Sequence, residues 1–586
     1  MRKPLPMTAG EMRDRGWDQL DVLIVTGDAY VDHPSFGAAI IGRVLESNGY
    51  RVGIVAQPDW KNPESFTVMG MPRLFAGVTS GNMDSMVNHY TSNNRIRSDD
   101  AYTPDGMPGN RPDRAVLKYT NSLQRAMKGI PVVLGGIEAS LRRITHYDFW
   151  SDRLKKSILL DSKASILVYG MGERQVVEIA RRLDKSETLA GIPGTAIAVH
   201  YGKYQPEEGD VTLPSHEELN SNPVEMLKLS KLLEANQNPW CGARLIQRAD
   251  SRIVIVEPPA EPLSTAELDK VYDLPYTRLP HFSYRDEIPA LTMIKDSITV
   301  VRGCSGGCTF CTIGLHQGKF ITSRSRESVL REAAEISSSP AFRGTISDLG
   351  GPTANMYGLG CDDPEQMKKC RRPSCLYPEI CSHFRTDHSS YIDLLTKTGE
   401  VPEVKNVFIS SGIRHDVALR DPDFMARLTS KNISGHLRIA PEHTHDRILA
   451  LMRKPTREVW ERFAAEFNKN AGRSGRKQYI VPYIIAAFPG CTIGDMQAAR
   501  SFLETMGAIP RQVQIFLPTP MTVATAMYFC GRSYPDGEPL RIPKKPSDKQ
   551  QQKDMILYGI KGAKNYDRND AVNRRKGFSG KPPRHQ

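Results

Sequence analysis

Strand and helix patterns alternate along the first third of the chain. Short apolar runs predict buried strands, and apolar residues at every third or fourth position predict helices between them. The predicted strands are 21–28, 51–57, 131–136, 165–170 and 195–200, and the predicted helices are 36–49, 113–128 and 173–183. This alternation is typical of a doubly wound parallel sheet, which binds ligands at the carboxyl ends of its strands. The residues expected to gather there are Asp28, Asp32, His33, Gly135 and Gly136.

A second alternating series begins near residue 291. The predicted strands are 297–303, 344–351, 406–413, 435–442, 478–488 and 512–520, with helical stretches between most of them. Six strands with intervening helices predict a partial (β/α)6 barrel, whose active face lies just past the strand ends. We therefore expect an amino-terminal α/β domain over 1–204 and a barrel domain over 291–540, which carries an insert at 352–400. Residues 205–290 are less regular and rich in proline, which predicts a helical and extended connector.

Composition places the chain among soluble globular proteins. Hydrophobic residues make up 39% and charged residues 25% of the sequence, and no apolar run is long enough to span a bilayer. The first residues contain no secretory signal, so we expect a cytoplasmic protein with reduced thiols and no membrane partner.

The net charge of +12 is concentrated at the carboxyl end, in residues 541–586. This segment is poor in apolar residues and predicts a flexible, disordered basic tail. It could contact nucleic acid or an acidic partner, or it could only increase solubility.

Three of the ten cysteines lie together directly after the first predicted barrel strand. Cys304, Cys308 and Cys311 follow the spacing Cys-x3-Cys-x2-Cys. A structural zinc site needs four ligands, and His316 could supply the fourth. A four-iron cluster held by three thiolates would instead leave one iron open for a substrate or cofactor. The small residues between the cysteines would let the backbone wrap a bulky cluster.

This cysteine loop resembles the signature of the radical S-adenosylmethionine (SAM) superfamily. The resemblance implies a [4Fe–4S] cluster on Cys304, Cys308 and Cys311, with SAM bound to the open iron. One electron from the cluster would cleave SAM to methionine and a 5′-deoxyadenosyl radical, which abstracts a hydrogen atom from a substrate. An electron donor such as flavodoxin or ferredoxin is then expected.

Two further segments resemble cofactor-binding motifs of that superfamily. "DLGGPTANMYG" looks like its Gly-Gly-Glu motif, so Gly350 and Gly351 would receive the amino group of SAM, although Pro352 and Thr353 replace the acidic residue. "APEHTHDRILALMRKP" and "IIAAFPGCT" are similar to segments of its methylthiotransferases, which implies that Glu442 points towards the cofactor ribose. Alternatively, the two glycines form a tight turn and Glu442 caps a helix. His443 and His445 are expected at the surface or in hydrogen bonds.

Nearly the whole chain resembles the YgiQ family of radical SAM proteins, whose substrate is not established. The leading hypothesis is a radical SAM enzyme, but the sequence does not identify its catalytic residues. A narrower hypothesis is a radical SAM enzyme that modifies RNA, as the methylthiotransferase-like motifs and the basic tail suggest. The alternative from another class is a non-catalytic, metal-dependent binding or sensing protein.

Two features are left open by the sequence. Similar amino-terminal domains bind cobalamin through Asp-x-His-x-x-Gly, but in "VDHPSFG" the spacing of Asp32, His33 and Gly37 departs from that motif. The alternatives are cobalamin without a histidine ligand, or a degenerate domain that covers the barrel mouth or binds substrate. The predicted insert carries Cys361, Cys370, Cys375 and Cys381, which could hold zinc, hold a second iron–sulfur cluster or stay as reduced thiols. Cys241, Cys491 and Cys530 are isolated and expected to be packed.

Overall fold

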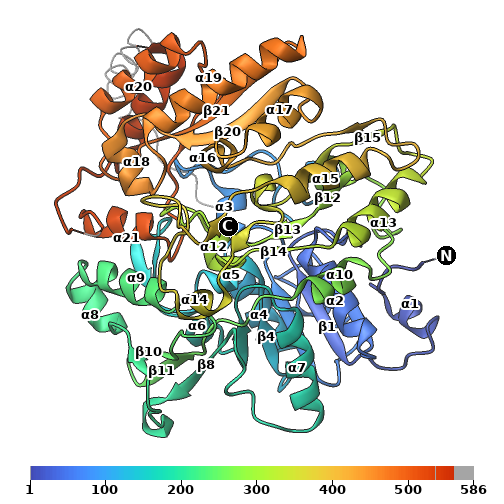
Figure 1. Cartoon of the computed structure of the whole chain (residues 1–586). Helices are drawn as coiled ribbons and strands as arrows, with labels where there is room; N and C mark the ends of the chain where they lie inside the picture. Colours follow the sequence, from blue (N-terminus) through green and yellow to red (C-terminus); the bar gives the residue numbers. More distant parts are fainter. Residues whose placement is uncertain (1, 535, 560–586) are drawn as a thin grey trace, which may run out of the picture.

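The computed structural model covers the whole chain and describes residues 2–534 and 536–559 (Figure 1). An amino-terminal domain, drawn blue to green, lies against a barrel domain, drawn yellow to red. The largest group of buried apolar side chains contains residues of both domains, so the two share one core. Within the described residues, no helix is long and apolar enough to cross a membrane.

The amino-terminal domain is built on a nine-stranded sheet with the order β2-β1-β3-β4-β7-β8-β11-β10-β9. Its first five strands are parallel, in an order typical of flavodoxin-like folds, and their switch point lies between β1 and β3. These strands are β1 (Val22–Thr26), β2 (Val52–Ala56), β3 (Phe75–Thr79), β4 (Val132–Leu134) and β7 (Ile166–Val168). The predicted doubly wound sheet is therefore present, with β3 as a strand that the sequence reading missed.

The sheet continues past the predicted domain boundary. It adds β8 (Thr195–His200), β9 (Val211–Thr212), β10 (Leu245–Ala249) and β11 (Arg252–Val256). β11 is antiparallel to both β8 and β10, and β10 turns into β11 at Asp250 with a positive φ of 51°. The prediction of a connector over the whole of 205–290 is thus wrong, because this hairpin belongs to the front sheet. The prolines that suggested a connector come only after β11.

Helices cover the sheet close to where the periodicity predicts them. α2 (Gly37–Ser47), α4 (Ala115–Ala126) and α7 (Glu173–Asp184) fall within or near the predicted ranges. The apolar side chains of α2 and α7 pack on one face of the sheet, and those of α4 pack on the other.

The barrel strands follow one another in chain order. Parallel pairing joins β12 to β16, β15 to β19, and β20 to β21 to β22, and a parallel bridge between Ile413 and Ile439 links the third strand region to the fourth. The elements are β12 (Ser297–Thr299), β13 (Val301–Arg302), β15 (Thr345–Ile346), β16 (Asp348–Gly350), β19 (Asn406–Val407), β20 (His436–Glu442), β21 (Tyr479–Ala486) and β22 (Gln514–Ile515). All lie inside the six predicted strand ranges.

Helices on the outside of the barrel separate these strands. They are α13 (Arg326–Ser337), α15 (Ser389–Thr398), α17 (Pro422–Lys431), α19 (Arg457–Ser474) and α20 (Ile493–Thr505). The Asp421 side chain caps α17 at the Phe424 amide, 2.9 Å away, as the sequence predicts. Because α15 is one of the barrel helices, the insert is shorter than the predicted 352–400. Its own elements are β17 (Gly360–Cys361), α14 (Pro364–Lys369) and β18 (Phe384–Arg385).

The start of the predicted disordered tail is ordered. Residues 546–559 are helical, and Met555 and Ile556 are buried in the shared core. The Gln552 side chain accepts a hydrogen bond from Ala487 N at 2.8 Å and donates one to Cys491 O at 3.1 Å. The tail prediction is therefore wrong for 541–559, whose sparse apolar residues fall on one buried helix face. Its remainder, 560–586, lies outside the described residues.

This helix should contribute to stability. Replacing Ile556, which is fully buried, by alanine removes core contacts and should destabilise the native state by about 2–5 kcal/mol. Tyr558→Ala on the same helix is the matched control, because Tyr558 is 65% exposed. Thermal unfolding should give a clearly lower midpoint for Ile556→Ala alone. Equal midpoints for the two variants would contradict the packing of this helix.

Candidate metal and cofactor site

The three-cysteine loop begins at the carboxyl end of β13. Gly303 has a φ of 83°, and a Cβ at this position would lie 2.1 Å from the Phe320 carbonyl oxygen, so only glycine fits. The loop is fixed by its backbone, since Cys304 N donates to Gly318 O at 3.1 Å and Cys311 N donates to Cys308 O at 3.2 Å. All three cysteines are partly exposed and line one small cavity of about 40 Å³. The structure therefore gathers Cys304, Cys308 and Cys311 at the barrel mouth.

The folded loop disfavours ionisation of Cys311. Burial, followed by the charges of Cys308 and Cys304, raises the pKa of Cys311 to about 12. Thiolates that face one another in a buried site repel, and they become stable as a set when a cationic centre lies between them. This is the electrostatic setting of a metal-binding site.

Arg414, a buried cation that was not predicted from the sequence, lies beside the loop. Arg414 is 5% exposed, and its Nη1 lies 3.6 Å from Cys308 Sγ while its Nε donates to Asp416 at 2.9 Å. Burial alone would lower the pKa of Arg414, but Asp416 and Cys308 raise it above its ordinary value. The guanidinium therefore stays charged and can stabilise negative charge on the sulfur.

Arg414 is positioned by an asparagine from the segment after β16. The Asn355 side chain accepts from Arg414 N at 2.8 Å and donates to Arg414 O at 3.0 Å. Asn355 also lies 3.3 Å from His388 Nε2, and His388 Nδ1 lies 3.1 Å from Asp421. The only sequence signal for Arg414 is its place just past the third predicted strand, where barrel enzymes carry functional residues.

Gly350 and Gly351 end β16 next to the cysteine loop. A Cβ on Gly350 would lie 2.2 Å from Ser411 Oγ, and one on Gly351 would lie 2.6 Å from Val301 O. Close approach of the Val301 backbone therefore requires glycine at 351, whereas Gly350 meets only side-chain atoms. Thr353, where the superfamily motif has an acidic residue, places Oγ1 3.6 Å from Cys304 Sγ. The predicted contact of the two glycines with SAM stays a prediction.

Glu442 ends β20 at an irregularity in its pairing with β21. It has a φ of 70°, an uncommon value for a residue with a side chain. Burial raises the pKa of Glu442, and the charges of Lys454 and Arg414 partly offset this, while its own charge acts on Cys311. Its carboxyl group therefore lies in the same electrostatic site as the cysteines and Arg414. The alternative role as a helix cap is excluded, because His445 is the residue that caps α18 (Asp446–Met452).

The candidate histidines have other partners. His316 Nδ1 lies 3.0 Å from Ser140 Oγ of the front domain, and burial lowers the pKa of His316 to about 4. Among the described residues, no three His, Cys, Asp or Glu side chains are placed to hold a single metal ion, which argues against a preformed zinc site with His316. His443 is buried against Cys491, with Nε2 3.5 Å from Sγ, as expected for a hydrogen-bonding residue.

In the cobalamin-like motif of the front domain, Gly37 lines a cavity but Asp32 and His33 do not. Asp32 accepts from Arg43 Nε at 3.0 Å and from Thr277 N at 2.9 Å, so its charge is already paired. His33 is 1% exposed and accepts from Ser35 N at 3.1 Å. Of the five residues expected to lie together at this edge of the sheet, Gly135 and Gly136 line a cavity there. Asp28, Asp32 and His33 do not.

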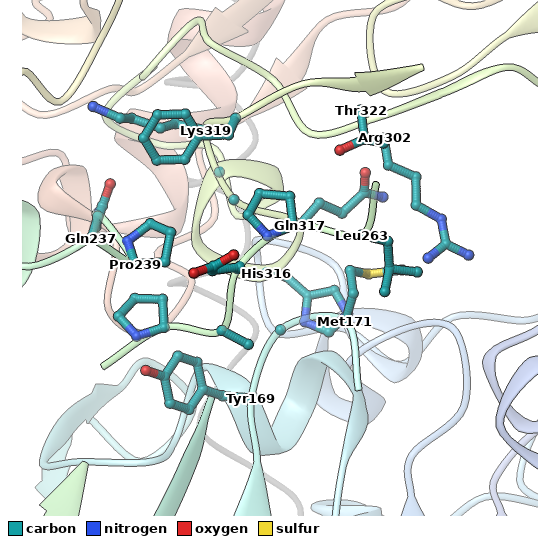
Figure 2. Close-up of a pocket in the computed structure, with 18 of the residues that line it drawn as sticks. Tyr169, Met171, Gln237, Pro239, Leu263, Arg302, His316, Gln317, Lys319 and Thr322 are labelled. Carbon is teal, nitrogen blue, oxygen red and sulfur yellow. The ribbon is translucent and has the colours of Figure 1, made fainter. Parts of the chain in front are cut away.

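Two cavities lie between the front domain and the barrel. The smaller one, about 120 Å³, is lined by Tyr169 and Met171 on one side and by His316 and Lys319, which follow the cysteine loop, on the other (Figure 2). The larger one, about 470 Å³, lies at the carboxyl ends of the front strands. Its apolar and glycine wall comes from β1, β3, β4 and α2, and its other wall contains barrel residues Thr299, Val301 and Pro352.

A buried ion pair crosses between the domains at the larger cavity. Arg302, two residues before Cys304, bonds Glu173 at the start of α7, and both side chains are at most 7% exposed. Arg302 Nη2 and Glu173 Oε2 are buried without a hydrogen-bond partner in the described structure. Buried polar atoms of this kind usually find a partner, so the cavity has polar groups available for a ligand.

Comparison with known proteins places the chain in a family. A model described as "Radical SAM N-terminal" matches residues 4–297, one described as "Radical SAM superfamily" matches 298–503, and a domain of unknown function matches 511–571. A UPF0313 protein of Methanocella arvoryzae is 46% identical over 562 residues, which are 96% of this chain and 94% of the relative. A UPF0313 protein of Geobacter sulfurreducens is 47% identical over 559 residues, 95% and 92% of the two chains.

The fold also resembles a solved structure. The radical S-adenosylmethionine methyltransferase TsrM from Kitasatospora setae, solved with cobalamin and a [4Fe-4S] cluster bound, aligns with a TM-score of 0.51 at 15% identity. The alignment covers 91% of this chain and 84% of TsrM, and at this identity it shows the fold alone. The family matches extend over nearly the whole sequence, and the protein therefore belongs to the UPF0313, or YgiQ, family of radical SAM proteins.

Proposed function

We propose that this protein is a radical SAM enzyme in which Cys304, Cys308 and Cys311 hold a [4Fe–4S] cluster and SAM binds the fourth iron. The observation that carries the proposal is the placement of the three thiols in one cavity at the end of the first barrel strand, beside the Arg414 cation. When bound, the cluster and SAM would supply one-electron cleavage of the SAM sulfonium bond and a 5′-deoxyadenosyl radical. The donor set fits such a cluster, since three thiolates leave one iron open.

The chain's own residues would bind and orient SAM. The backbone of Gly350 and Gly351, at the end of the strand beside the cysteine loop, would receive its amino group. The Glu442 carboxyl group, which lies near Cys311, can accept hydrogen bonds from ribose hydroxyl groups. The shared core and the front domain over the barrel mouth would limit the access of water to a radical. The substrate is not identified by these residues.

The RNA-modifying version of this function stays a prediction. It depends largely on the basic tail, and residues 560–586 lie outside the described part of the chain. The electron donor and the cytoplasmic location are predictions of the same kind.

Reductive cleavage of SAM should be measurable directly. After anaerobic reconstitution with iron and sulfide, wild-type protein given dithionite and SAM should form 5′-deoxyadenosine, detected by liquid chromatography and mass spectrometry. The triple variant Cys304→Ala, Cys308→Ala, Cys311→Ala should form none. Cys530→Ala, which changes an isolated thiol, should match the wild type. Tight zinc binding without nucleoside formation would instead support the non-catalytic binding or sensing protein.

Arg414 should raise the midpoint reduction potential of the cluster. Its positive charge favours the reduced, more negative state, so Arg414→Gln should lower the midpoint potential, by about 59 mV or more if reduction becomes at least tenfold less favourable. The double variant Arg414→Gln, Asp416→Asn avoids leaving the Asp416 carboxylate buried and unpaired. Redox titration followed by electron paramagnetic resonance measures the shift, and Arg420→Gln, at an exposed position, is the control. An unchanged potential in Arg414→Gln would exclude this role.

We also propose that the larger cavity binds cobalamin without a histidine from the front-domain motif. The support is a cavity of about 470 Å³ at the sheet's ligand-binding edge, in a fold shared with a cobalamin-bound enzyme. The apolar wall, which includes Ile24, Phe75 and Gly77, suits the aromatic nucleotide end of the molecule. The partnerless atoms of Arg302 and Glu173 suit its amide groups. The cavity has no place for His33, so a ligand from that residue is not part of the proposal.

Filling the cavity should abolish this binding. Gly77 lines the cavity and has room for a Cβ, so Gly77→Leu should project into it, and Ala38→Phe should do the same from α2. After incubation with hydroxocobalamin and gel filtration, the wild-type protein should still show the visible absorbance of cobalamin. Both variants should lack this absorbance, although their thermal stability should be unchanged. Ala190→Phe, at an exposed position, is the control. No retention by the wild type, or equal retention by the filled variants, would overturn the proposal.

A further inference from the structure

The four cysteines of the insert lie on one compact backbone frame. Cys361 in β17 pairs with Phe384 in β18, and Phe384 N donates to Cys381 O at 2.9 Å. Cys381 N in turn donates to Cys375 O at 2.8 Å. This chain of contacts brings three cysteines together although they are up to 20 positions apart in sequence.

The fourth cysteine is joined to the frame by a buried lysine. Lys319 is 5% exposed, and its Nζ lies 3.7 Å from Cys370 Sγ and 2.6 Å from Arg372 O. Cys375 interacts electrostatically with Cys370, Cys381 and Lys319, and Cys361 interacts with Cys381 and Cys370. The four thiols therefore form one group, with the Lys319 cation beside Cys370.

The front domain holds this group in place. The Asn238 side chain, 2% exposed, donates to Met367 O at 2.8 Å and to Cys370 O at 2.9 Å, at the end of α14. Arg371 donates to Ala235 O at 2.8 Å and to Cys241 O at 2.9 Å. The insert is thus fixed by a second domain rather than free to move as an isolated loop, which suits a preformed metal site.

The described thiols of the insert are not placed to hold a single metal ion. Four thiolates around tetrahedral zinc, with Zn–S bonds of about 2.3 Å, would have sulfurs about 3.8 Å apart. Among the described residues, no group of three possible ligands is placed for a single metal ion, and this applies equally to the three cysteines of the radical SAM signature. An iron–sulfur cluster needs wider spacing, because each thiolate binds a different iron. All ten cysteines are described and are free thiols, so disulfides do not account for the group.

We propose that Cys361, Cys370, Cys375 and Cys381 bind a second iron–sulfur cluster, of the [4Fe–4S] type, with one thiolate on each iron. Such a cluster has no open iron, so it would carry electrons rather than bind a substrate. Its binding does not depend on the proposed cleavage of SAM.

The insert contacts the first cysteine loop directly. Cys375 N donates to Ser305 O at 3.0 Å, and Ser374 Oγ donates to Gly306 O at 2.8 Å. Lys319 contacts Cys370 and also lines the cavity of the first three cysteines. Ser305 and Gly306 lie between Cys304 and Cys308, so the two groups of thiols are separated by little more than one layer of backbone.

This contact places the second cluster on a path for electrons. A low-potential one-electron donor, of the flavodoxin or ferredoxin class, would be oxidised by one electron as it reduces the second cluster. The second cluster would then be reoxidised as it passes that electron to the first. No proton or group is transferred in either step.

Iron counting in matched variants tests the site. Reconstituted wild type should hold about 8 iron per chain, and about 4 should remain in the triple variant of Cys304, Cys308 and Cys311 and in the quadruple variant of the insert cysteines, each changed to alanine. The double variant Cys241→Ala, Cys530→Ala should keep the wild-type content. After reduction, the cluster left in the triple variant should give an electron paramagnetic resonance signal that SAM does not alter.

The outcomes separate this inference from the proposed function. Iron retained in the triple variant supports the second site whether or not the wild type cleaves SAM. A folded triple variant without iron, or a wild type with one zinc at the insert cysteines, would overturn it. In the quadruple variant, SAM cleavage driven by dithionite should persist, while cleavage driven by reduced flavodoxin should fall at least tenfold. Equal rates with flavodoxin would overturn the electron path.

Discussion

The site depends on the repulsion between three thiolates in a buried setting. Cys304, Cys308 and Cys311 face one cavity, and burial together with the other two sulfurs holds the pKa of Cys311 far above its ordinary value. Arg414, the cation whose guanidinium contacts Cys308, is already engaged with Asp416. One shared guanidinium cannot balance three thiolates, so the site as folded favours a cationic centre that binds all three. A cluster would turn this unfavourable arrangement into a stable one.

The position of the front domain follows from the same loop. Arg302, which is two residues before Cys304, is fixed by the front-domain carboxylate Glu173, and His316, just past the loop, is fixed by Ser140. The loop is therefore held at both ends by a different domain. Breaking a buried pair such as Arg302–Glu173 would leave an uncompensated charge, so the two domains are coupled by electrostatics as well as by their shared core. A ligand in the larger cavity would contact this pair, which gives it a direct route to influence the cysteine loop.

The parts of the fold that could be predicted from the sequence are those in which apolar residues repeat at regular intervals or cysteines follow a known spacing. The barrel strands and the first helices were found because their apolar residues repeat at regular intervals, and the cysteine loop was found because three thiols follow a fixed spacing. β3 was missed because Gly77 and the small residues around it weaken the strand pattern, and β10 and β11 were hidden beside a proline-rich segment. The helix at 546–559 was misread because only a few apolar residues, such as Met555 and Ile556, carry its packing. Arg414 could not be assigned, since its role comes from contacts with Cys308 and Asn355, which are distant in sequence.

Gly307, between Cys304 and Cys308, allows close contact between the cysteine loop and the insert. Gly307 has a φ of 62°, and a Cβ there would lie 2.6 Å from Pro373 O and 3.0 Å from the Cα of Ser374. The first cysteine loop can therefore meet the insert backbone only because this residue has no side chain. A loop that served a single cluster would not need such an approach to a second cysteine segment. The requirement for glycine at this contact, together with the hydrogen bonds of Ser374 and Cys375, joins the two cysteine segments through their backbones.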